Sequence, residues 1–218
     1  MQSEFWSPIL LSLKVASISV ILVFVAGILF ARLLSKGQFK GKMLIEIFLL
    51  LPIVLPPTVI GFLLIFIFGG NSPVGLFINH LFSSTIMFTP MAAVIASSIV
   101  AFPLMYQTVK IGFQSVDNGI EEAARVDGAN EWSVFFLVTL PLSSRSIITG
   151  LILSFTRALG EFGATFMFAG NIPGKTQTAP TAIYIAMESG NMNLAWLLVL
   201  AMIFLSALML FATNITQK

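Results

Sequence analysis

The chain has 218 residues, of which 57% are hydrophobic and only 9% are charged, and its formal net charge is +2. This composition excludes a soluble globular protein, in which roughly 25% of residues are charged. Cysteine is absent and His80 is the single histidine, so the chain has no thiolates for disulfides or metal sites and no histidine cluster. We expect no bound metal, no cofactor and no catalytic residues.

Apolar stretches long enough to cross a membrane recur along the chain, since a spanning helix needs about 20 mostly apolar residues. We count five: Val15–Leu34, Met43–Phe68, Ile86–Tyr106, Ile147–Phe168 and Leu194–Thr213. The sequence therefore predicts an all-α, polytopic integral membrane protein in which residues 1–218 form one transmembrane domain. Val74–Phe82 is too short to cross alone and is expected to form a surface or re-entrant helix. If it pairs with a broken second span, the count becomes six.

Prolines interrupt the second predicted span. Pro52, Pro56 and Pro57 are followed by Gly61, and each proline removes a backbone donor, so we expect the helix to kink or unwind near Pro56. A bent packing helix and a gate are both compatible with this pattern.

The basic residues give the orientation. If there are five spans, one side holds most of them: Arg32, Lys36, Lys40, Lys42, Lys110, Arg125, Arg145 and Lys218. The other side has Lys175 and Lys14. The positive-inside rule then places the N-terminus outside the cell membrane and the C-terminus in the cytoplasm. The first apolar run is longer than the core of a signal peptide, so we expect it to remain uncleaved.

A polar segment, residues 117–145, separates the third and fourth predicted spans, and we call it the polar loop. It holds five of the nine acidic residues. Asn118 followed by Glu121 suits a helix start, Gly128 suits a helix end, and Asn130 followed by Glu131 suits a second start. The sequence thus predicts two short helices joined at Gly128 on the cytoplasmic side.

The two helices are expected to differ in what they present. On the second helix, one face is aromatic and should press against the membrane domain: Trp132, Phe135 and Phe136. The first helix and the turn carry small side chains that would face outward and suit a groove on a partner: Ala123, Ala124, Val126 and Ala129. The alternative is an amphipathic helix lying on lipid, which is disfavoured because acids outnumber bases in the loop.

The run from Glu122 to Pro141 resembles the signature loop of permease subunits of ATP-binding-cassette importers. Matching residues are Glu122, Ala123, Ala124, Gly128, Leu140 and Pro141, while Val138 stands where isoleucine is common. In that family the loop forms a coupling helix that docks into a cytoplasmic ATPase subunit. The resemblance implies that the same residues, with Asp127 and Ala129, contact the ATPase here, and that ATP is hydrolysed on another chain.

A second stretch, from Arg157 to Thr178 and on to Tyr184, is similar to the permeases of molybdate importers. Sulfate permeases share Arg157 to Glu161 and the run Gly170-Asn171-Ile172-Pro173, but the continuation Gly174-Lys175-Thr176-Gln177-Thr178 looks like the molybdate branch. Ala179 departs from the expected leucine. Together the two stretches cover about a third of the chain.

Arg157 and Glu161 lie four residues apart in the fourth predicted span, so an ion pair within the helix is expected. Charges at that depth usually face a bundle interior or a water-filled path. The pair either lines the anion route or fixes packing at a dimer interface. Candidate residues for the route are Arg157, Glu161, Gly163, Thr165, Lys175, Thr176, Gln177 and Thr178.

Ala169-x4-Gly174-Lys175-Thr176 nearly matches a nucleotide-binding P-loop. A P-loop needs a preceding strand, a following helix and glycine at its first position. Because this run leaves a predicted membrane span and Pro180 follows it, we interpret the match as false. A loop on the outer side is expected instead.

The family resemblance implies a non-enzymatic transport subunit that works by alternating access. Its expected partners are a second copy of itself, cytoplasmic ATPase subunits, an extracytoplasmic molybdate-binding protein and membrane lipid, with no nucleic acid. A sulfate or tungstate permease is the near alternative, since these oxyanions present similar charge. An ATP-independent anion transporter or channel is the distant one, and it would predict an internal repeat, which the sequence does not show.

Overall fold

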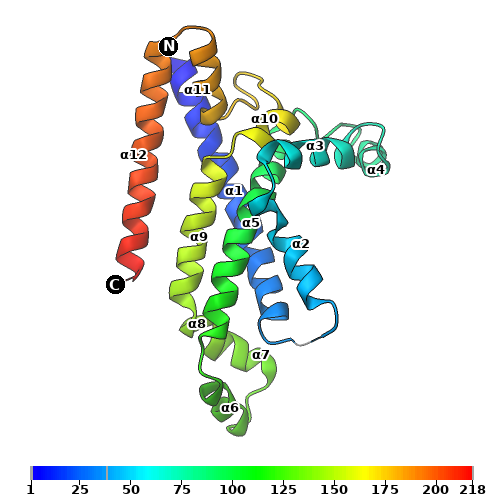
Figure 1. The fold of residues 1–218 in the computed structure, drawn as a ribbon, viewed down its shortest axis with the longest axis vertical. Helices are drawn as coiled ribbons and strands as arrows, with labels where there is room; N and C mark the ends of the chain where they lie inside the picture. Colours follow the sequence, from blue (N-terminus) through cyan, green and yellow to red (C-terminus); the bar gives the residue numbers. More distant parts are fainter. Residues whose placement is uncertain (1, 38, 218) are drawn as a thin grey trace.

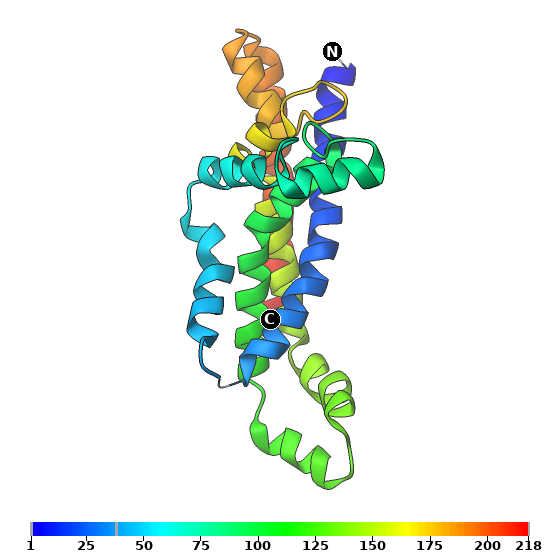
Figure 2. The same ribbon diagram turned by 90° about the vertical axis from the view of Figure 1, so that its right-hand side faces the viewer.

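The computed structural model describes residues 2–37 and 39–217, and within them every regular element is a helix. Three of these helices form the centre of an elongated bundle: α1 (Gln2–Ser35), α5 (Pro90–Gln114) and α9 (Ser144–Leu159). Figures 1 and 2 show α1, α5 and α9 side by side, with α12 (Met192–Gln217) flanking α9. The predicted all-α class is confirmed.

Small side chains let the central helices approach closely. Ala16, Ala31 and Ala101 are fully buried between α1, α5 and α9. A Cβ added at Gly27 of α1 would lie 2.7 Å from Cγ of Met105, so the two helices nearly touch there. Close approach at small residues is how helices associate where lipid removes the hydrophobic driving force.

The spans number up to five among the described residues. Three single helices are long and apolar enough to cross: Ser3–Ser35, Pro90–Gln114 and Met192–Ala212. Two bent pairs bring the number to five: Lys42–Val54 with Pro57–Phe68, and Glu131–Leu142 with Ser144–Leu159. Each predicted span overlaps one of these helices or pairs, although the second bent pair begins inside the polar loop, and the described part of the chain offers no sixth.

The second predicted span breaks where the prolines indicated. Helix α2 (Lys42–Val54) and helix α3 (Pro57–Phe68) meet at an angle of 115°. Leu55, between them, is extended, as the residue before a proline prefers to be, and Pro57 begins α3. Helix α3 and helix α4 (Pro73–Phe82) project sideways from the bundle (Figure 1). The predicted short helix at 74–82 is therefore present, outside the bundle.

The fourth predicted span, Ile147–Phe168, is not one helix, and this expectation was wrong. Helix α9 ends at Leu159, and helix α10 (Gly163–Ala169) starts after a break that contains Glu161. Glu161 Oε1 accepts a hydrogen bond from the backbone N–H of Ala164 at 2.9 Å. The glycines at 160 and 163 favour the break, and the carboxylate replaces the backbone acceptor that the first turn of α10 lacks. Helix α11 (Ala179–Glu188) follows and leads into α12.

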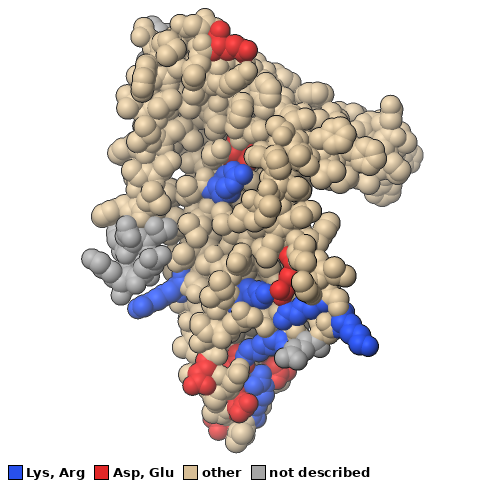
Figure 3. All heavy atoms as spheres, viewed as in Figure 1, with Lys and Arg blue, Asp and Glu red and all other residues tan. Residues whose placement is uncertain are grey.

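The polar loop lies at the opposite end of the bundle from the N-terminus (Figure 1). It contains α6 (Asn118–Val126), α7 (Glu131–Val134), the π-helical turn η1 (Phe135–Thr139) and α8 (Leu140–Leu142). Figure 3 shows most of the charged side chains on this face gathered over that end. The charged side chains are thus concentrated at one end of the apolar bundle, as expected of a membrane domain with one polar end.

Candidate functional site: the polar loop and the α9–α10 junction

The two helices of the polar loop are joined at Gly128, as predicted. Helix α6 ends at Val126, and Gly128 adopts φ +93°, a left-handed conformation that glycine tolerates best. The N–H of Gly128 bonds the carbonyl of Arg125 at 3.0 Å, and the N–H of Ala129 bonds that of Ala124 at 3.0 Å. The turn between the helices is therefore closed by backbone bonds to the end of α6.

The start of α6 differs from the expectation by one residue. Asp117, rather than Asn118, caps the helix, and its Oδ1 accepts the N–H of Gly119 at 2.8 Å. Glu121 was expected to complete a capping box with Asn118. It turns inward instead and is the only buried residue of α6, whose nine residues are all described.

Most residues of α6 and the turn that were predicted to face outward are exposed. Val126 is 86% exposed, and Ala123, Glu122 and Asp127 are exposed as well. Ala124, Ala129 and Leu140 are half-buried, while Gly128 and Pro141 are exposed. A Cβ at Gly128 would meet no atom within 4 Å. The predicted coupling residues thus lie at an open end of the molecule, and apolar side chains are presented there without cover.

The aromatic face of the second helix was only partly predicted. Phe135 is buried against Phe113 of α5, with ring centroids 5.6 Å apart. Trp132 and Phe136 stack on each other but are 64% and 53% exposed. The guanidinium of Arg32 lies 4.2 Å from the Trp132 ring centroid and 4.1 Å from that of Phe135. Phe136 also contacts Phe135 edge-on, with ring centroids 5.1 Å apart, so the three rings form one cluster of which only Phe135 is buried. Trp132 contacts the cation of Arg32 and is otherwise largely exposed.

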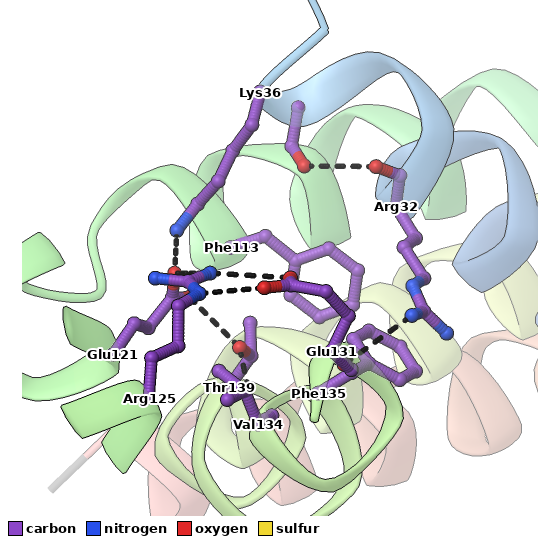
Figure 4. A pocket seen from close by; sticks show the side chains of 10 residues that line it. Arg32, Lys36, Phe113, Glu121, Arg125, Glu131, Val134, Phe135 and Thr139 are labelled. Atoms are coloured by element: carbon purple, nitrogen blue, oxygen red, sulfur yellow. Dashed lines mark hydrogen bonds and ion pairs between the residues drawn. The ribbon is translucent and has the colours of Figure 1, made fainter. Parts of the chain in front are cut away.

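Figure 4 shows what Glu121 contacts. Its carboxylate accepts hydrogen bonds from Lys36 Nζ, just beyond α1, and from Thr139 Oγ1 of η1 at 2.8 Å. Arg125, one turn later on α6, lies 3.5 Å from Glu121 and makes a closer pair with Glu131 at 2.6 and 3.2 Å. These groups line a polar cavity of about 160 Å³ together with Arg32, Ser35, Phe113, Val134 and Phe135.

Electrostatics keep this carboxylate charged. Burial raises the pKa of Glu121, but the hydrogen bonds from Lys36 and Thr139 and the nearby charges of Lys36 and Arg125 together leave its pKa below the ordinary value. The hydrogen bond to Glu131 raises the pKa of Arg125. The loop is thus held by ionised groups at neutral pH.

Sequence reasoning missed this cluster. Arg32 and Lys36 served only as orientation markers and Glu121 only as a cap. The Glu121–Arg125 spacing of four residues is a local signal that could have shown a pair within α6, but Lys36 lies 85 residues from Glu121. No local pattern connects residues that far apart.

At the α9–α10 junction the predicted Arg157–Glu161 pair is present. Arg157 Nη1 lies 2.7 Å from Glu161 Oε2, with the Arg157 side chain 33% exposed and that of Glu161 buried. The pair bridges the end of α9 and the start of α10 instead of lying within one helix. Gly163 allows α10 to approach α3, since a Cβ there would lie 2.9 Å from Cβ of Pro57.

The remaining route candidates divide into buried and exposed residues. Thr165 is fully buried, and the structure shows no hydrogen-bond partner for its hydroxyl among the described residues. Thr176 accepts the N–H of Ile172 at 3.0 Å, and Thr178 bonds Thr181 at 3.0 Å, so both have structural partners. Lys175 is exposed and Gln177 half-buried.

The near-match to a P-loop has the wrong structural context. Residues 170–178 form an irregular loop between α10 and α11, and no strand precedes it among the described residues. Thr176 is buried within the loop itself. This agrees with the interpretation of a false match.

Taken together, these features define a class: a polytopic helical membrane protein that presents a helix–turn–helix at one polar end. Comparison with known proteins gives the family. Residues 16–218 match the model described as "Binding-protein-dependent transport system inner membrane component". The chain belongs to this family.

Relatives and solved structures agree with that assignment. The chain is 54% identical to the putative molybdenum transport system permease protein YvgM of Bacillus subtilis (strain 168), over 96% of this chain and 92% of that protein. It is 44% identical to the molybdenum transport system permease protein ModB of Escherichia coli (strain K12), over 84% and 80%. The inward-facing MetNI methionine ABC transporter superposes with a TM-score of 0.73 at 17% identity, covering 98% and 94%, which shows the shared fold.

Proposed function

We propose that this chain is the permease subunit of an ATP-driven importer that moves molybdate across the cell membrane by alternating access. Family membership, the names of the relatives and the exposed helix–turn–helix support the proposal. The observation that carries it is the end of α6, where Val126 and the Gly128 turn stand uncovered beyond the bundle. Residues 1–218 act as a single transmembrane domain in this account.

In the proposed mechanism, a cytoplasmic ATPase subunit receives α6 and the following turn. The contact residues are Glu122, Ala123, Ala124, Asp127, Gly128 and Ala129, with Leu140 and Pro141 supporting the second helix. Small and exposed side chains suit insertion into a groove, because they present little bulk and lose little conformational entropy on binding. ATP hydrolysis belongs to the ATPase chain, and this chain contributes motion.

The anion route is proposed to run past the α9–α10 junction. Arg157 offers positive charge there, while Glu161 holds the guanidinium at 2.7 Å and offsets part of its charge. A partly neutralised cation attracts a dianion without holding it tightly, which suits a path more than a storage site. Gly163 and Thr165 belong to the same junction, and Lys175, Thr176, Gln177 and Thr178 are assigned to the loop at the outer end.

Several partners follow from the same proposal. One chain of five spans encloses little space, so a second copy related by two-fold symmetry completes the path. Two ATPase subunits bind on the cytoplasmic side, an extracytoplasmic molybdate-binding protein delivers the anion, and lipid surrounds the apolar flank of α12. The N-terminus lies outside and the polar loop and C-terminus lie in the cytoplasm.

The proposed docking surface is tested by co-purification with the candidate ATPase. Val126→Arg places a long cation on the exposed apolar tip and keeps a residue that favours the helix, and Gly128→Trp adds bulk at the turn. Both are expected to reduce the recovered ATPase by tenfold or more, on the order of 1.4 kcal/mol of binding free energy. The matched control is Asn193→Trp, which adds the same bulk at an exposed position of α12, at the end of the bundle opposite the polar loop. Recovery of ATPase by all three variants at the wild-type level would contradict the docking surface.

A further inference from the structure

Helix α6 is attached to the rest of the protein in an unusual way. It has no apolar residue in the core, and its single buried residue is a glutamate. Ile120 and Val126, its large apolar side chains, are 48% and 86% exposed. Hydrophobic packing therefore does not fix this helix, and polar contacts do, with Glu121 as the one buried member.

The carboxylate of Glu121 joins three segments that are distant in sequence. Lys36 follows α1, Thr139 ends η1, and Glu121 itself lies in the first half of α6. Lys36 Nζ also donates to Asn118 Oδ1 at 3.3 Å, which adds a second contact with α6. A buried carboxylate without its cation is costly, so the three segments are expected to stay joined at Glu121.

A separate set of contacts maintains the internal shape of the polar loop. Arg125 pairs with Glu131 through two bonds of 2.6 and 3.2 Å and thereby ties α6 to α7. Arg32 of α1 contacts α7 and η1 separately, through the Glu131 carbonyl and the Trp132 and Phe135 rings. The pair of Lys36 with Glu121 is thus the contact that joins α6 itself to the segment after α1. A change at Lys36 alters the link while the Arg125–Glu131 brace remains in place.

Helix α1 extends from this link to the other end of the molecule. Its 34 residues give a rod of about 50 Å. Near its start, the buried hydroxyl of Ser12 accepts the N–H of Ala179, the first residue of α11, at 2.7 Å. Gln177 and Gly174 of the preceding loop line a small cavity with Ser3 and Ser7 of α1. One continuous helix therefore contacts the polar loop at one end, through Arg32, and the loop before α11 at the other.

We infer that Glu121 is a positioning residue that, through Lys36, transmits displacement of α6 to α1 and hence to the far end of the bundle. This inference rests on the proposed function, because the displacement comes from the docked ATPase. Glu121 is buried and contacts its own chain, so its task differs from that of the exposed docking residues. The link converts ATPase movement into movement of the path.

The test separates ATPase binding from coupling. Lys36→Met removes the lysine partner of Glu121, but Arg125 still lies 3.5 Å from the carboxylate and compensates part of its charge, so folding should survive; Glu121→Gln removes the charge itself. Each complex is reconstituted with its ATPase and a molybdate-loaded binding protein. Two quantities are measured: ATPase bound per permease, and molybdate taken up per ATP hydrolysed. There are two controls. Lys36→Arg keeps the cation, and Lys40→Met removes an exposed lysine from the same segment between α1 and α2.

We expect both variants to bind ATPase as the wild type does, while uptake per ATP falls about tenfold. Uptake per ATP in the double variant should be no lower than in the more impaired single variant, because both substitutions remove the same link. Both controls should keep the wild-type ratio. An unchanged ratio in Lys36→Met and Glu121→Gln would overturn this inference and leave the proposed function intact. Loss of ATPase binding in Lys36→Met would do the same, since it would make the link part of the docking surface. Failure of the wild-type chain to bind an ATPase would overturn the proposed function as well.

Discussion

Glu121 and its neighbours show how a charged residue can replace apolar packing at a site that has to move. The carboxylate is 3% exposed and receives hydrogen bonds from a lysine and a threonine, so its desolvation is compensated. Lys36 remains 41% exposed, and solvent therefore weakens the pair relative to a fully buried one. In the proposed mechanism, the hydrogen bonds of Glu121 keep α6 and the segment after α1 in a fixed relative position.

Acidification should release this link. The pKa of Glu121 is lowered in the folded protein from its ordinary value of 4.5, so its stabilising contribution is present at neutral pH and is lost as the pH falls below 4.5 through the folded pKa. Thermal unfolding of the purified protein is the measurement. At pH 7, Glu121→Gln should lower stability by about 1–2 kcal/mol. The difference between variant and wild type should shrink as the pH approaches the folded pKa, and a difference that persists or grows on acidification would contradict the assignment.

At the scale of elements, close contacts between helices position the α9–α10 junction. Helix α10 packs against α3, and Gly61 of α3 makes this possible: a Cβ there would lie 2.8 Å from Cβ of Met167 and 3.2 Å from Cα of Ala164. The nearby backbone atom cannot move away as a flexible side chain does. The proline break before α3 and the hydrogen bond from the N–H of Ala164 to Glu161 at the start of α10 allow these two short helices to pack against each other.

A larger residue at Gly61 should separate α3 from α10. Gly61→Val forces the helices apart at a cost of about 1–3 kcal/mol, and uptake by the reconstituted complex should fall strongly while ATPase binding persists. Gly70 provides the matched control, because a Cβ there meets no atom within 4 Å. Gly70→Val should leave uptake near the wild-type level. Equal effects of the two substitutions would show that the α3–α10 contact does not matter.

Sequence patterns predicted some elements well and others poorly. Long apolar runs and prolines are local signals, so the spans, the bend near Pro56 and the turn at Gly128 were predictable. The break at Glu161 was not predicted, because Gly160 and Gly163 alone are tolerated inside a membrane helix and the side-chain bond from Glu161 to Ala164, which marks the new helix start, has no sequence signature. The exposure of Trp132 was not predictable either, because its contact with Arg32 joins residues about 100 positions apart. Long-range pairs of this kind have no local signature.

For the whole molecule, the orientation in the membrane can be tested directly because the chain has no cysteine. Ser3→Cys and Lys40→Cys each introduce a single thiol at exposed positions near opposite ends of α1. In intact cells, a membrane-impermeant maleimide should label Ser3→Cys only, and permeabilisation should expose Lys40→Cys. The positive-inside rule underlies this expectation. The reverse labelling pattern would invert the proposed orientation.

The most direct test of the whole account is uptake of molybdate into proteoliposomes that contain this chain and its ATPase. We predict that uptake requires ATP and a molybdate-loaded binding protein together, and that an excess of sulfate does not abolish it. The permease alone should move no anion. Uptake by the chain without the ATPase would contradict the importer account, and uptake that follows sulfate in preference to molybdate would contradict the assigned substrate.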